Sequence, residues 1–139
     1  MPSDNGGYAN DINDNGWVVG CASGLNGSRR AFRWRNGTTE DLGTPGTFGE
    51  ARAINNSGII AGYYLTSSTS HAFVWDNGVM SDLGVSCDAY GINDNGWVVG
   101  SSSNRAVLWT PVPEPSSLIA LLGAITSMSY VNLRKNGSR

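Results

Sequence analysis

The sequence has few charged residues, only two cysteines and a single histidine. Charged residues make up 14% of the chain and the net charge is −2, so it lacks the basic surface that nucleic-acid binding needs. Neither Cys21 nor Cys87 stands in a Cys-x-x-Cys or other metal-binding spacing. Because His71 is the only histidine, the spacing supports no Ser/His/Asp or Cys/His catalytic set. These shortages predict a protein without catalytic residues, cofactor or metal site, and without a nucleic-acid partner.

Turn-forming residues, in contrast to charged ones, are abundant in the sequence. The chain has 139 residues, enough for one domain of ordinary size, and 19 of them are glycine. Asparagine and serine are frequent as well, and all three residue types favour tight turns. The composition therefore predicts many short strands and nearly excludes long helices from the first 110 residues.

Two segments recur in the same order along the chain. The first contains Ile12, Ile54 or Ile92, each followed by Asn and then by a glycine-containing turn. The second places two large apolar residues two positions apart, as in Phe73 and Trp75. The first segment occupies 8–20, 51–62 and 89–100, and the second occupies 30–37, 71–78 and 105–109. The spacing is 42 residues and then 38 residues, which is typical of a repeat array.

Each repeat is predicted to contain two hairpins. The turn at 13–16 and the turns at Asn36-Gly37 and Asn77-Gly78 supply the residues that adopt positive φ. Four short strands in about 40 residues match one blade of a β-propeller. We therefore predict an all-β, propeller-like array of about two and a half four-stranded repeats within residues 1–110. The repeats lie near 8–50, 51–87 and 88–110, and a solenoid or an irregular stack of β-meanders is the alternative.

The third repeat is expected to stop short, because Trp109 runs directly into Thr110-Pro111. About two and a half units cannot close a ring that takes four to eight blades. Met1–Gly7 is polar and has no signal peptide. These observations predict a truncated N-terminus, with the chain as the C-terminal piece of a longer array. Self-association through the open edge is the alternative.

The two segments together resemble the bacterial extracellular HAF repeat family. The triplet that gives the family its name stands here as His71-Ala72-Phe73, and Arg30 and Arg105 replace the histidine in the other copies. The resemblance covers residues 8 to 109. It implies secretion and a propeller-like repeat, and it implies no defined activity.

The end of the chain resembles a second family, the PEP-CTERM sorting signals of Gram-negative bacteria. The prolines of the linker at 111–117 keep it extended, and it contains the motif Val112-Pro113-Glu114-Pro115. An apolar run begins at Leu118, and the chain finishes with the basic residues Arg134, Lys135 and Arg139. In that family the motif is read by an exosortase, a membrane-bound processing enzyme, in bacteria that make exopolysaccharide or biofilm.

The tail at 118–139 is predicted to be a hydrophobic helix followed by a basic end. Ser116 or Ser117 is a natural N-cap for it, and the cations are expected to stay on the cytoplasmic side while the helix inserts transiently in the membrane. The apolar stretch from Leu118 to Leu133 is shorter than the about 20 residues of an ordinary span. An amphipathic helix packed on the body is the alternative.

Other motifs favour ordinary structural roles. The segment from Asp11 to Gly16 matches the opening of a calcium-binding loop, but Ala22 stands where a bidentate Glu is needed. A turn built from Asn and Asp is the simpler interpretation.

The two cysteines are interpreted as small apolar side chains, with a disulfide as the alternative. Four tryptophans are interpreted as blade core rather than as a platform for sugars: Trp17, Trp34, Trp75 and Trp97.

The sequence therefore predicts a non-enzymatic β-repeat protein of the cell envelope or extracellular space of a Gram-negative bacterium. Its expected role is binding or adhesion in the polysaccharide matrix, after sorting at the inner membrane by an exosortase-type enzyme. The alternative is a C-terminal fragment of a secreted hydrolase whose catalytic residues lie upstream.

Overall fold

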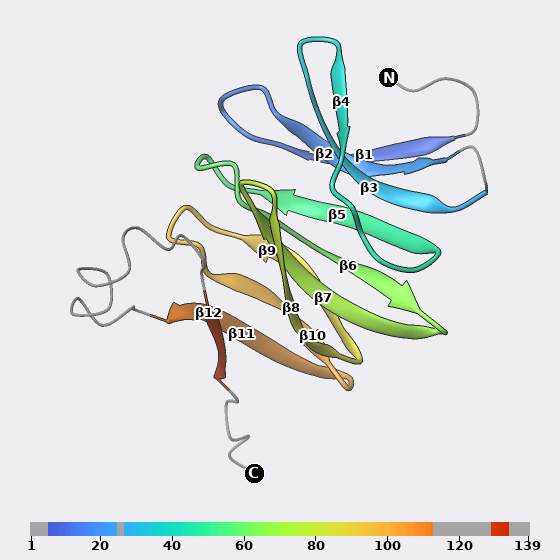
Figure 1. Cartoon of the computed structure of the whole chain (residues 1–139). Helices are drawn as coiled ribbons and strands as arrows, with labels where there is room; N and C mark the ends of the chain where they lie inside the picture. Colours follow the sequence, from blue (N-terminus) through green and yellow to red (C-terminus); the bar gives the residue numbers. More distant parts are fainter. Residues whose placement is uncertain (1–5, 25–26, 113–128, 134–139) are drawn as a thin grey trace, which may run out of the picture.

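The computed structural model describes residues 6–24, 27–112 and 129–133, and every regular element in these ranges is a β-strand (Figure 1). The strands are β1 Gly7–Ile12, β2 Val18–Ser23, β3 Arg29–Arg35, β4 Thr38–Asp41, β5 Phe48–Ile54, β6 Ile60–Thr66, β7 Thr69–Asp76, β8 Val79–Val85, β9 Cys87–Ile92, β10 Val98–Ser102, β11 Arg105–Val112 and β12 Ser129–Leu133. The all-β class predicted from the composition is confirmed. No helix that could span a membrane occurs among these residues.

The strands form three antiparallel meanders that follow one another from the top to the bottom of Figure 1. Unit one contains β1–β4, unit two contains β5–β8, and unit three contains β9–β12. A single parallel bridge between Arg29 and Phe48 joins units one and two into one eight-stranded sheet. Unit three is a separate four-stranded sheet, and the described strands form an open row rather than a closed propeller ring.

Tight turns connect the strands where the sequence predicts them. Asn36 and Gly37 have φ angles of 50° and 83°, and Asn77 and Gly78 have φ angles of 47° and 89°. Two consecutive positive φ angles define the type I′ turn, which matches the twist of a two-stranded hairpin. Both Asn-Gly pairs therefore turn the chain from the third to the fourth strand of their units.

The first repeated segment ends in a glycine, and a bulge in the first hairpin of each unit requires glycine at that position. The register shifts between Ala9 and Asp11 in unit one and between Ala51 and Ala53 in unit two. Gly62 pairs with Ala51, and a Cβ atom at Gly62 would lie 2.0 Å from the Glu50 carbonyl oxygen. Equivalent glycines at 20 and 100 approach Tyr8 and Asp88 in the same way. The close approach of two backbones requires glycine there.

Two apolar cores lie between the three units. Phe73 and Trp75 of β7 belong to the core shared with unit one, and Ala72 and Val74 belong to the core shared with unit three. Successive side chains of a strand point to opposite faces, so unit two is buried on both sides. This arrangement explains why its strands are apolar at consecutive positions rather than only at alternate ones.

The predicted C-terminal helix is wrong. Residues Ser129–Leu133 lie inside the segment that was expected to be helical, and they form β12, which pairs with β11 from Leu108 to Val112. The edge of β11 offers unpaired backbone groups, and Tyr130 and Val131 are residue types that favour strands. The rest of the predicted helix, 118–128, lies outside the described residues, as do Arg134, Lys135 and Arg139.

The count of two and a half units is also wrong, because unit three has a fourth strand. In units one and two the fourth strand follows a two-residue turn, whereas β12 comes from beyond residues 113–128. The third unit therefore completes its meander with a strand that is remote in the sequence.

Candidate functional site

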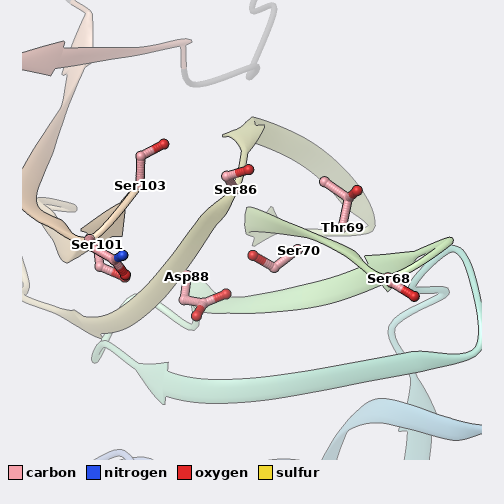
Figure 2. A pocket seen from close by; sticks show the side chains of 8 residues that line it. Ser68, Thr69, Ser70, Ser86, Asp88, Ser101 and Ser103 are labelled. Carbon is pink, nitrogen blue, oxygen red and sulfur yellow. The ribbon is translucent and has the colours of Figure 1, made fainter.

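A pocket of about 390 Å³ lies where hairpin ends of units two and three meet (Figure 2). Its lining is almost entirely hydroxyl-bearing and carries one carboxylate: Ser68, Thr69, Ser70, Ser86, Asp88, Ser101, Ser103 and Asn104. We call it the serine pocket. The residues come from the β6–β7 turn, the start of β7, the β8–β9 connection, β9, β10 and the β10–β11 turn. Three neighbouring chain reversals thus place their polar side chains around one hollow.

Four lining residues of the serine pocket hold backbone conformations that L-amino acids rarely adopt. The φ angles are 73° at Ser68, 54° at Ser86, 47° at Ser103 and 63° at Asn104. Serine is not a preferred residue for this region, where glycine and asparagine are favoured. At Ser68, Ser103 and Asn104 the positive φ belongs to the two-residue turns of the β6–β7 and β10–β11 hairpins, so the turn type accounts for it as it does at Asn36.

Asp88 supplies the charge of the serine pocket. Its Oδ1 atom is buried, and no donor among the described residues reaches it. An ionised carboxylate only accepts hydrogen bonds, so a ligand that meets Asp88 in the lining of the serine pocket has to bring a hydroxyl or an N–H group. Figure 2 shows Asp88 among the lining side chains between Ser70 and Ser101.

An aromatic ring adjoins the serine pocket. The Tyr90 hydroxyl lies 3.1 Å from the Ser101 Oγ atom, and the Tyr90 side chain is exposed. The Arg52 guanidinium lies 4.9 Å from the Tyr90 ring and 4.6 Å from the Tyr63 ring, which fixes Tyr90 against unit two. The site therefore combines hydroxyl and carboxylate groups with an apolar ring beside them.

A second polar cluster surrounds the only histidine. The His71 Nδ1 atom lies 2.9 Å from Asp82 Oδ2 and its Nε2 atom lies 3.0 Å from Thr66 Oγ1. The Tyr64 hydroxyl donates to the same Asp82 oxygen at 3.0 Å, and the Tyr64 and His71 rings stack. The Thr–His–Asp order is that of a nucleophile, a base and an orienting acid, a set that sequence spacing did not reveal.

The protonation of this cluster is set by burial and by its own hydrogen bonds. Burial of Asp82 opposes its ionisation, but hydrogen bonds from the Gly84 N–H, His71 and Tyr64 outweigh it and lower the pKa of the carboxyl. Burial, together with the hydrogen bond to Asp82 and its charge, raises the pKa of Tyr64 to about 12. At neutral pH the cluster thus holds an ionised Asp82 and a neutral Tyr64.

Unit one shows that the His71 cluster is a repeat feature. Arg30 takes the place of His71 there and lies 3.9 Å from Asp41, which takes the place of Asp82. Asp41 accepts a hydrogen bond from the Gly43 N–H, as Asp82 does from the Gly84 N–H. The aspartate therefore holds the chain just after β4 in unit one and at the irregular end of β8 in unit two. His71 is not among the residues that line the serine pocket.

The residues of the predicted sorting motif lie mostly outside the described chain. Val112 is the last residue of β11 and pairs with Ser129. Pro113, Glu114 and Pro115 are not among the described residues. Pro111 lies within β11 but beyond the last pair with β10, so only β12 lies beside it. That position accommodates a residue without an N–H group.

The calcium-like segment is used within the protein. Asp11 accepts hydrogen bonds from the Ile12 and Ile54 N–H groups, and Asn13 Oδ1 accepts from the Asn15 and Trp17 N–H groups. Within residues 6–24, 27–112 and 129–133, no three metal-binding side chains gather in one place. Cys21 and Cys87 are both buried and unbridged.

The tryptophans fall into three classes of exposure. Trp75 and Trp109 are buried in the two cores, Trp17 and Trp34 are half-buried, and Trp97 is exposed. The Trp17 ring is covered by the Arg33 guanidinium, which lies 4.4 Å from it and 4.5 Å from the Trp75 ring. The core interpretation therefore holds for Trp75 but not for Trp97.

The serine pocket was missed by the sequence prediction, although a signal was present. Residues 66–70 and 101–103 are runs of serine and threonine at the ends of strands. Comparison with family models, curated proteins and solved structures finds no match.

Proposed function

We propose that this chain is a non-enzymatic, surface-directed β-repeat protein that binds polysaccharide in the extracellular matrix through the serine pocket. The carrying observation is the Asp88 carboxylate in the lining of a hollow whose other walls are mostly hydroxyl groups. Sugar hydroxyls both donate and accept hydrogen bonds, so they complement a carboxylate and several serine hydroxyls together. The exposed ring of Tyr90 offers the apolar surface on which a sugar ring can lie.

The binding proposal predicts that Asp88→Asn weakens sugar binding about tenfold without unfolding the protein. The change removes the charge that strengthens a hydrogen bond from a sugar hydroxyl, a loss of about 1.5 kcal/mol. The measurement is calorimetric titration of the full chain with the best-bound member of an array of neutral and acidic oligosaccharides. Ser57→Ala, an exposed turn substitution outside the serine pocket, is the matched control. Equal affinity in the Asp88→Asn variant and the wild type would refute the proposal.

We also propose that an exosortase-type enzyme of the inner membrane recognises Val112–Pro115 and delivers the acidic repeats to the cell surface. The support is the order of extended motif, apolar run and basic end in the sequence. With the three cations of the tail removed from the net charge of −2, the residues up to Glu114 carry −5. The tail thus has the opposite sign of charge to the rest of the chain. This is expected of a sorting signal that is cleaved off.

The sorting proposal predicts that replacing Pro113, Glu114 and Pro115 with alanine retains the protein in the inner membrane. The full chain, preceded by a secretion signal, is expressed in a Gram-negative host that processes such tails. The surface form of the wild type is expected by intact-mass measurement to lack residues 118–139, and β12 with them, and the triple variant is expected to be absent from the surface. A surface form that retains residues 118–139 would contradict the proposal.

A further inference from the structure

Equivalent residues of the three units differ sharply in exposure at the two ends of the row. Ile54 in unit two is 6% exposed because it packs against unit one, whereas Ile12 in unit one is 63% exposed. Val19 of unit one is fully buried against unit two, whereas its equivalent Val99 in unit three is 51% exposed. Each end of the row therefore presents side chains that elsewhere in the molecule are covered by a neighbouring unit.

A ladder of asparagine side chains crosses the boundaries between units in one direction. The Asn13 Nδ2 atom donates to the Asn55 carbonyl at 3.0 Å, and the Asn55 Nδ2 atom donates to the Asn93 carbonyl at 3.1 Å. Among the described residues, Asn93 Nδ2 has no such acceptor, and no asparagine side chain donates to the Asn13 carbonyl. One end of the ladder thus presents a donor and the other end presents an acceptor.

We propose that the chain associates head to tail with a second copy of itself. Trp97, Val99 and Ala106 define the C-terminal end face, and Ala9 and Ile12 define the N-terminal end face. The C-terminal end face of one copy packs against the N-terminal end face of the next, and Asn93 continues the ladder onto the Asn13 carbonyl of that copy. The contact repeats the one already formed between units, with alanine and branched apolar residues on one side and the first strand of a unit on the other.

The occupant is a second copy because both halves of the contact are present on this chain. The first strand that covers Val19 in unit one carries Ala51 and Ile54. The same residue types stand at Ala9 and Ile12, on a strand with the same bulge. Since the two faces differ, the contact is heterologous and adds copies in one direction rather than forming a closed pair.

One pair of charges opposes this association. Within the chain, Asn56 lies between two aspartates, its Nδ2 atom donating to Asp14 at 2.8 Å and to Asp94 at 3.3 Å. Continuation of the row places Asp94 of one copy beside Asp14 of the next, without an amide between them. Like charges at this position weaken the contact, so association strengthens at higher salt concentration.

The test uses two variants of the full chain, each with one end face blocked. Val99→Arg blocks the C-terminal end face and Ile12→Arg blocks the N-terminal end face. Both residues are largely exposed, so neither change disturbs the folded chain. In sedimentation velocity, the wild type is expected to grow in mass with concentration and each variant alone is expected to be monomeric. An equimolar mixture of the two variants is expected to form a dimer and nothing larger, because one intact face of each kind remains.

Several outcomes would overturn the proposal. A wild-type chain that stays monomeric up to about 100 μM leaves no role for the contact, since even weak specific interfaces associate there. A mixture that stays monomeric shows that the faces do not bind each other. An Ile12→Arg variant that dimerises alone shows a symmetric contact between C-terminal end faces instead.

A third variant tests the registry of the contact. In Asp94→Asn, position 94 carries the same amide as position 56, so it can donate to Asp14 of the next copy as Asn56 donates to Asp94. The dissociation constant is expected to fall about fivefold, with a weaker dependence on salt. Unchanged association would show that the copies do not continue the row in register.

Discussion

Replacing Asn55 with alanine is expected to lower the free energy of unfolding of the full chain by about 3 kcal/mol. The side chain is 4% exposed and makes two hydrogen bonds, accepting from the Ile59 N–H at 2.9 Å and donating to the Asn93 carbonyl at 3.1 Å. Ile59 is itself buried, so its N–H group would be left without an acceptor and without water. Urea denaturation followed by tryptophan fluorescence measures the change.

Asn93 provides the matched control for Asn55. Its Oδ1 atom accepts from the Asn95 and Trp97 N–H groups in the same turn geometry, but the residue is exposed. Water can replace these bonds, so Asn93→Ala is expected to cost about 1 kcal/mol. Equal losses in the two variants would show that the asparagine stabilises its own turn only, and not the contact between units.

Gly62→Ala is expected to destabilise the chain by about 3 kcal/mol or more. The new Cβ atom would lie 2.0 Å from the Glu50 carbonyl oxygen and 3.0 Å from the Ala51 Cα atom. Both obstacles are backbone atoms, so no change of rotamer relieves the contact. The bulge would have to open in the unit that carries both apolar cores.

Gly91→Ala is the control for Gly62→Ala. Its Cβ atom would meet only the end of the Val99 side chain, at 3.2 Å, which can shift toward solvent. Gly91→Ala is expected to lower the free energy of unfolding by less than about 1 kcal/mol. Thermal or urea unfolding measures the change. If Gly62→Ala proved equally mild, the close approach of the two backbones would not be what requires glycine.

Local features of the fold could be predicted from the sequence. The Asn36-Gly37 turn and the burial of Trp75 follow from turn chemistry and from alternation within a few residues. The pairing of β12 with β11 could not be predicted, because residues 113–128 separate the two strands and a local pattern says nothing about distant pairing. The helical prediction followed from an apolar run, whereas tertiary pairing decided the state of Ser129–Leu133.

The candidate site was hidden for a similar reason. Ser68, Ser86 and Ser103 each stand in a turn, and one turn serine has no meaning as a ligand-binding group. Only the stacking of units two and three brings them around Asp88. The asparagine ladder is equally invisible in one repeat, because the role of Asn55 in its own turn already accounts for its presence.

The pairing of β12 with β11 also sets how the molecule yields to mechanical force. The two strands are antiparallel, with Leu133 beside Leu108 and Ser129 beside Val112. A pull on the chain at Leu133, with the repeats held at Gly7, loads the Leu108–Leu133 pair first, and the pairs then break one after another. Peeling of this kind requires less force than sliding a whole strand, because the hydrogen bonds fail singly rather than together. The fourth strand of unit three would therefore detach first under tension, with the cores between the units still intact.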